Sequence, residues 1–206
     1  MTRSLRVAAV ALALLTLAAC SSKGGHHDST DGPLRTTLGG GGNSIAVPRK
    51  ADWPWPATFG GLLICADEKV TLLRVEPHYR LGRPADISFA VRTVPDAARR
   101  TGPQEAWGPV ITRAMPLDRL ARRHVRFERL TPLKGTTVDE PCLADPLADD
   151  PYTEILTTLE VDEGGVWIDR LDVHYRAGGR QHVLRVGWSY VGCGRAITDR
   201  DVCWVD

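Results

Sequence analysis

A strict alternation of apolar and polar residues near the C-terminal end most constrains what this chain can fold into. Leu171 and Val173 alternate with charged residues between positions 166 and 176, and Leu184 does the same between positions 181 and 191. A period of two places successive side chains on opposite faces of a β-strand. One apolar and one polar face are typical of an antiparallel sheet with a single wet face.

The pair Gly178-Gly179 marks the turn between these two strands. Glycine accepts the positive φ values that two-residue hairpin turns require. With this pair at the tip, Val173 lies opposite Leu184 on the apolar face, and Asp172 lies opposite Arg185 on the wet face. Pairs of both kinds stabilise a hairpin, so we predict this register.

A second turn signal, Glu163-Gly164-Gly165, precedes the hairpin. Placed at another tip, it brings segment 152–161 beside segment 166–176, with Val161 opposite Trp167. The three C-terminal segments then form a three-stranded meander.

Short runs with strand character also occur earlier in the chain, whereas a proline begins segment 116–123, as is common in the first turn of a helix. Segments 95–109 and 131–151 are expected to be long loops. The expected strands are 61–65, 70–75, 87–94, 110–113 and 124–130. About seven short strands separated by turns predict an all-β protein, an antiparallel β-sandwich with the C-terminal three-stranded meander and one short helix. An immunoglobulin-like arrangement is one version of this fold.

The N-terminal 20 residues have the three parts of an export signal. Two arginines begin it, residues 7–17 are apolar apart from Thr16, and Ala18-Ala19 supplies the small residues needed near a cleavage site. The apolar run is shorter than the roughly 20 residues that span a bilayer. An ordinary secretory signal cut near Ala19 is one interpretation.

Leu17-Ala18-Ala19-Cys20 also resembles the lipobox of bacterial lipoproteins, a resemblance that covers about a tenth of the chain. It implies that residues 1–19 are a lipoprotein signal peptide and that the Cys20 thiol accepts a diacylglyceryl group. Two acyl chains, palmitate for example, anchor a protein stably where one is marginal. The resemblance therefore places the protein on the extracytoplasmic face of a cell membrane, held by lipid on Cys20.

Residues 20–50 are interpreted as a flexible tether and residues 51–206 as the β-sandwich domain. Glycines are frequent between Gly24 and Gly42, and apolar residues are few. Such a tether spans roughly 30 Å. His26-His27-Asp28 lies in it, but neighbouring residues rarely bind one metal ion without further ligands, so we predict no metal site.

Charge narrows the classes of partner. Without residues 1–19, 24 basic residues face 25 acidic ones. A nearly neutral chain lacks the basic footprint of nucleic-acid binding. The expected partners are therefore the membrane and an unknown protein or envelope polymer, with no nucleic acid.

Four cysteines remain when Cys20 is set aside, and exported proteins commonly form disulfides. Four cysteines allow three connectivities. We prefer Cys193 with Cys203, because glycines flank Cys193 in a turn-like segment, which leaves Cys65 with Cys142. No pair has the close spacing of a zinc knuckle.

The motifs that resemble known catalytic or calcium-binding sequences are incomplete. Gly187-Trp188-Ser189 resembles the start of a nucleophile elbow, but the final glycine is missing and Ser189 falls inside a strand. The acidic residues between Asp139 and Asp150 do not have the spacing of an EF-hand. We therefore predict no catalytic residues and no cofactor.

The wet face of the C-terminal hairpin is the candidate binding surface. It is formed by Arg170, His174, Arg176 and Arg185. The other interpretation of these residues is an ordinary solvated face, partly neutralised by Asp172. Arg74, Arg92, Arg126 and Arg129 extend this basic strip if their strands lie in the same sheet. The expected function is a non-enzymatic binding module. The alternative is a secreted hydrolase or transferase with catalytic residues on its loops.

Overall fold

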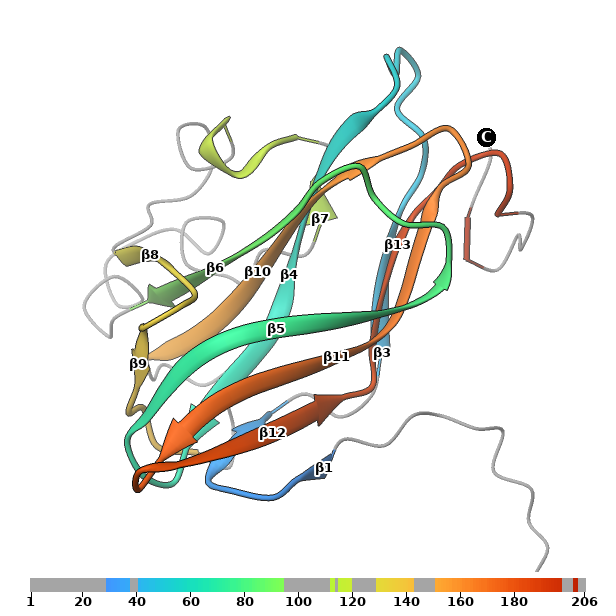
Figure 1. Ribbon diagram of the computed structural model, residues 1–206. Helices are drawn as coiled ribbons and strands as arrows, with labels where there is room; N and C mark the ends of the chain where they lie inside the picture. The colour runs from blue at the N-terminus through green and yellow to red at the C-terminus, as the bar shows by residue number, and fades with distance from the viewer. Residues whose placement is uncertain are drawn as a thin grey trace, which may run out of the picture.

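Two β-sheets pack face to face in the computed structural model, as Figure 1 shows. The structure describes residues 29–37, 41–94, 112–113, 115–119, 129–142, 151–197 and 202–203. The predicted all-β sandwich is confirmed, and residues 117–119 form a helical turn within the segment expected to be helical.

Sheet A contains the C-terminal hairpin. Its strands are β1 (Ser29–Thr30), β3 (Gly41–Ile45), β5 (Val70–Leu81), β9 (Thr137–Val138), β11 (Val166–Ala177), β12 (Arg180–Val186) and β13 (Trp188–Gly192). β5 pairs along one edge of β11, while β12 and β13 lie in line along the other edge. The register shifts by one residue at Gly187, so the expected strand 181–191 is one strand with an interruption.

Sheet B forms the second layer. Its strands are β2 (Leu34–Thr36), β4 (Trp55–Ala66), β6 (Ile87–Val94), β7 (Thr112–Arg113), β8 (Arg129–Pro132) and β10 (Tyr152–Val161). The order is β2-β4-β10-β6-β8, and β7 also pairs with β4. Figure 1 shows β5, β11 and β12 in front of β4, β10 and β6.

The core lies between the two sheets and is made by the alternating apolar residues. Leu171, Val173 and Leu184 of sheet A and Ile155 and Phe59 of sheet B are all nearly inaccessible to solvent. Burying one such side chain stabilises the fold by about 1.5–3 kcal/mol. The period-two pattern therefore identifies the inner face of each sheet.

The hairpin between β11 and β12 has the predicted register. Val173 pairs with Leu184, and Asp172 pairs with Arg185. The turn glycines have φ values of 52° and 79°, which residues with a Cβ atom rarely adopt. The Gly178-Gly179 signal thus located the turn correctly.

The predicted pairing of Val161 with Trp167 is wrong, because segment 152–161 pairs with β4 and β6 and not with segment 166–176. Val161 pairs with Trp55 in sheet B, whereas Trp167 pairs with Val191 in sheet A. The turn at 162–165 connects the two sheets instead of two neighbouring strands. Both arrangements point the same alternate residues into the core, so alternation alone does not distinguish them.

The predicted domain boundary at residue 51 is also wrong. β1 and β3 extend sheet A, β2 extends sheet B, and the Leu34 side chain is fully buried. The Tyr175 hydroxyl lies 3.1 Å from the Thr30 hydroxyl oxygen and accepts a hydrogen bond from the Leu34 amide. The sandwich therefore begins by Ser29, because this segment supplies core residues and edge strands.

Both predicted disulfides are present. Cys65 on β4 is bonded to Cys142, and Cys193 after β13 is bonded to Cys203. The second bond holds the C-terminal segment against sheet A, where both half-cystines pack in a small cluster with Val191 and Ile197.

Several predictions concern residues that the structure does not describe. They are the signal peptide with Cys20, the segment His26-His27-Asp28, loop 95–109, and residues 120–128 with Arg126. Among the described residues, none belongs to a helix with the length and apolarity needed to cross a bilayer.

Candidate binding face

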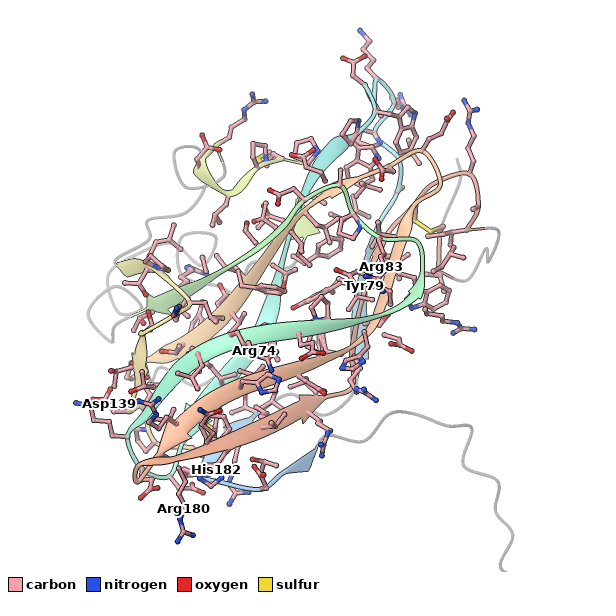
Figure 2. The ribbon with its side chains drawn as sticks, viewed as in Figure 1. Arg74, Tyr79, Arg83, Asp139, Arg180 and His182 are labelled. Carbon is pink, nitrogen blue, oxygen red and sulfur yellow. A yellow bond between two sulfur atoms is a disulfide. The ribbon has the colours of Figure 1, made fainter. Side chains whose placement is uncertain are left out.

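The outward-facing side chains of β5, β11 and β12 form one continuous charged surface, which we call the outer face of sheet A. Arg74 lies on this surface in Figure 2. The surface is defined by Arg74, Glu76, His78 and Arg80 of β5, by Arg170, Asp172, His174 and Arg176 of β11, and by Arg185 of β12. All four residues of the predicted binding face belong to it.

The same pattern of arginine, carboxylate and histidine occurs on two neighbouring strands. β5 carries Arg74-x-Glu76-x-His78, and β11 carries Arg170-x-Asp172-x-His174. The strands are antiparallel, so Arg170 lies opposite His78, Asp172 opposite Glu76, and His174 opposite Arg74. Two like charges share the central position, which by itself destabilises a sheet, and basic groups on both sides offset that repulsion.

Asp172 is held from two directions. Its carboxylate lies 3.2 Å from Arg170 Nε and 3.0 Å from His78 Nε2. Arg170 Nη2 in turn lies 2.9 Å from His78 Nδ1. These three side chains form a closed network, and Asp172 is only 14% exposed.

The Glu76 half of the pattern is more open. Arg74 Nη1 donates to Glu76 Oε2 at 2.6 Å, and His174 Nε2 lies 3.4 Å from that same oxygen. Arg74 is 58% exposed. The hydrogen bond from Arg74 is the main reason that the pKa of Glu76 lies below its ordinary value, with a smaller contribution from the charge of Arg74.

Arginines outnumber carboxylates on this face. Arg176 and Arg185 are exposed, and in the described part of the chain neither has an ion-pair partner. The guanidinium carbon of Arg80 lies 4.2 Å from the centre of the Trp167 ring. The guanidinium carbon of Arg83 lies 5.3 Å from the centre of the Tyr79 ring. Both residues are labelled in Figure 2.

Of the residues suggested to extend the basic strip, Arg74 does so and Arg92 does not. Arg92 lies on β6 in sheet B and is fully buried. Arg129 belongs to β8 of sheet B. The condition for these two residues to extend the strip, that their strands lie in the same sheet as the hairpin, is not met.

Arg92 pairs with Glu154 on the side of sheet B that faces away from the sandwich core. Arg92 Nη1 donates to Glu154 Oε1 at 2.6 Å and to the Tyr152 hydroxyl at 3.3 Å, and both charged side chains are fully buried. Glu154 Oε2 accepts a hydrogen bond from the Gly61 amide, where β4 has a bulge. Burial, and then the Glu154 charge, raises the pKa of Tyr190 above its ordinary value.

The pair His78–Asp172 has the geometry of the acid and base of a hydrolase triad. In such a triad the second imidazole nitrogen faces a nucleophilic hydroxyl or thiol. Here His78 Nδ1 faces the cationic Arg170 instead. Ser189 lies on β13 and accepts a hydrogen bond from Trp167 Nε1 at 3.0 Å, and among the described residues no histidine contacts its hydroxyl.

A pocket of about 320 Å³ lies beside this serine. Its lining includes Ser44, Trp167, Ser189 and Val202. The side chains of its lining residues offer hydroxyls, the Asn43 amide and apolar surface. No group of three or more potential metal ligands is assembled in the part of the chain that the structure describes.

Comparison of the chain with protein-family models, with curated proteins and with solved structures finds no match.

Glu76 and His78 are among the residues of this face that the sequence interpretation missed. The hairpin pattern identified β11 and β12 but did not show which earlier strand lies beside β11. The signal that would have found them is the repeated spacing of arginine, carboxylate and histidine in segments 74–78 and 170–174.

Proposed function

We propose that this protein is an extracytoplasmic lipoprotein, anchored through lipid on Cys20, and that its sandwich is a non-enzymatic module. In this proposal the outer face of sheet A binds an acidic protein or an anionic envelope polymer.

One observation carries the proposal: the distribution of charge on the outer face of sheet A. Both carboxylates of this face lie within networks with their own arginine and histidine neighbours. Arg176 and Arg185 are exposed and unpaired among the described residues, so they are available to an incoming anion. Clustered charge of one sign raises the association rate of an oppositely charged partner.

The cationic face is tested with a double variant, Arg176→Ala with Arg185→Ala. The matched control, Arg49→Ala with Lys50→Ala, removes the same charge from exposed positions outside this face. We expect the first variant to lose most of its binding to dextran sulfate at neutral pH and the control to keep it. Equal binding by the two variants would refute the cationic binding face.

The lipid anchor is tested separately by the intact mass of the mature protein. We expect an N-terminal Cys20 that carries a diacylglyceryl group, and Cys20→Ala should block processing or release the protein from the membrane fraction. An unmodified N-terminus at any other residue would contradict the anchor without affecting the binding face.

A further inference from the structure

We propose that His78 and His174 make the outer face of sheet A a pH-gated anion-binding site, which binds a polyanion more tightly as the pH falls. This inference rests on the proposed function, because it concerns regulation of the same face. Its starting point is the repeated pattern Arg74-x-Glu76-x-His78 and Arg170-x-Asp172-x-His174, in which each histidine contacts the carboxylate of the other strand.

His78 holds Arg170 in place only while its imidazole is neutral. A neutral imidazole has one donor and one acceptor nitrogen. His78 Nε2 lies 3.0 Å from the Asp172 carboxylate, which can only accept, so Nε2 is the donor of the neutral ring and Nδ1 its acceptor. Arg170 Nη2 lies 2.9 Å from Nδ1 and 3.1 Å from Nε2, so the guanidinium packs against both ring nitrogens. When the ring gains a proton, Nδ1 becomes a donor, so Arg170 loses its acceptor and faces a second cation. The guanidinium is one-third exposed already and is free to turn toward solvent.

His174 acts on Glu76 in a related way. Its Nε2 atom is 3.4 Å from the oxygen that Arg74 contacts at 2.6 Å. It is buried and has no hydrogen-bond partner among the described residues. A protonated His174 competes with Arg74 for this oxygen. Arg74 is more than half exposed, so it is the partner that leaves.

The charge of the six-residue pattern follows from these protonations. With both histidines neutral, two arginines balance two carboxylates, and with both protonated the pattern gains two positive charges. The groups that face the imidazoles are Arg74, Glu76 and Arg80 from β5, Arg170 and Asp172 from β11, and Arg185 across β11 from β12. Carboxylates ordinarily titrate near pH 4 and histidines near 6.5. The hydrogen bond from Arg74 holds the pKa of Glu76 below its ordinary value, which favours the ionised carboxylate.

The test measures binding of dextran sulfate, whose sulfate esters stay charged throughout, at constant ionic strength. From about pH 7.5 to about pH 5.5 we expect the dissociation constant to fall roughly tenfold, because two basic charges are added near a polyanion. In the double variant His78→Gln with His174→Gln, the dissociation constant should fall by less than about twofold over the same pH range, whatever its value at the higher pH. His182→Gln is the matched control, since His182 stacks on the buried Tyr175 and lies on the opposite side of sheet A from Arg185, and it should keep the full gain.

A gain of the same size in the His78/His174 variant would overturn the gate, as would the absence of a gain in the unchanged protein. Absence of binding at both pH values would instead overturn the proposed function. Nuclear magnetic resonance provides an independent test of the pH-gated mechanism. The Arg170 Nε–H signal, assigned by its loss in Arg170→Lys, should shift with the same midpoint as the His78 ring, and an Arg170 signal that does not follow that titration refutes it.

Discussion

Each sheet carries an arginine–carboxylate pair on the side that faces away from the core, and the two pairs lie in opposite environments. Arg92 and Glu154 of sheet B are fully buried. Arg170 and Asp172 of sheet A are partly exposed and share their charges with His78. The first pair is bound to a fixed set of neighbours, whereas solvent reaches the second. The same type of ion pair is therefore part of the buried structure in sheet B and accessible to a partner in sheet A.

The largest expected effect comes from breaking the buried pair. Glu154→Ala should lower the free energy of unfolding by about 3–5 kcal/mol, because it leaves the Arg92 charge buried without its counter-ion. Denaturation in urea measures the loss. The control is Glu76→Ala on sheet A, whose carboxylate is half exposed, and it should cost no more than about 1 kcal/mol. Equal losses would remove the distinction between the two sheets.

The N-terminal segment, which adds β1 to sheet A and β2 to sheet B, gives the next effect. Leu34→Ala should cost about 2–5 kcal/mol, since it creates a cavity in the core. Val47 is an exposed apolar residue a short distance along the chain, and Val47→Ala should change the stability by less than about 0.5 kcal/mol. If both variants unfold at the same urea concentration, segment 29–37 is not part of the cooperative unit.

Two neighbouring residues of β12 lie on opposite faces of sheet A and allow the inner and outer faces to be compared. Leu184→Ala should also cost about 2–5 kcal/mol, because Leu184 is buried in the core. Arg185→Ala should stay within about 0.5 kcal/mol, because Arg185 is exposed. Thermal and urea denaturation compare the two. A large loss at Arg185 would mean that the outer face contributes to stability and is not reserved for binding.

The smallest expected effect comes from Asp172, which contacts Arg170 and His78 on the outer face of sheet A. Asp172→Ala should lower the free energy of unfolding by no more than about 1 kcal/mol, as is usual for ion pairs that water reaches. It should also free Arg170 and so strengthen binding of dextran sulfate at neutral pH. Stability and binding are measured on the same preparation. A loss as large as that of Glu154→Ala would show that the two networks have the same structural role.

The disulfide pairing and the hairpin register were both predictable from sequence because they depend on local signals. A glycine pair sets the tip of the β11–β12 hairpin, and counting back from it gives Val173 opposite Leu184. Glycines beside Cys193 indicated the short disulfide, and the second followed by elimination. The outer-face residues on β11 and β12 follow from the same count.

The sheet in which each strand lies was decided only by the tertiary structure. Period-two alternation indicates which side chains face the core. It is equally compatible with a turn that connects the two sheets and with a hairpin inside one sheet. β10 therefore pairs with β4 and β6, although the pattern fits pairing with β11 equally well.

For the same reason the sequence by itself determined the charged face of the C-terminal hairpin but not its completion by Glu76 and His78. Nor did it determine the burial of Arg92, or the place of Leu34 in the core. Strand pairing uses backbone hydrogen bonds between segments far apart in the chain. Every residue except proline offers the same backbone groups, so the identity of the side chains says little about which strands pair.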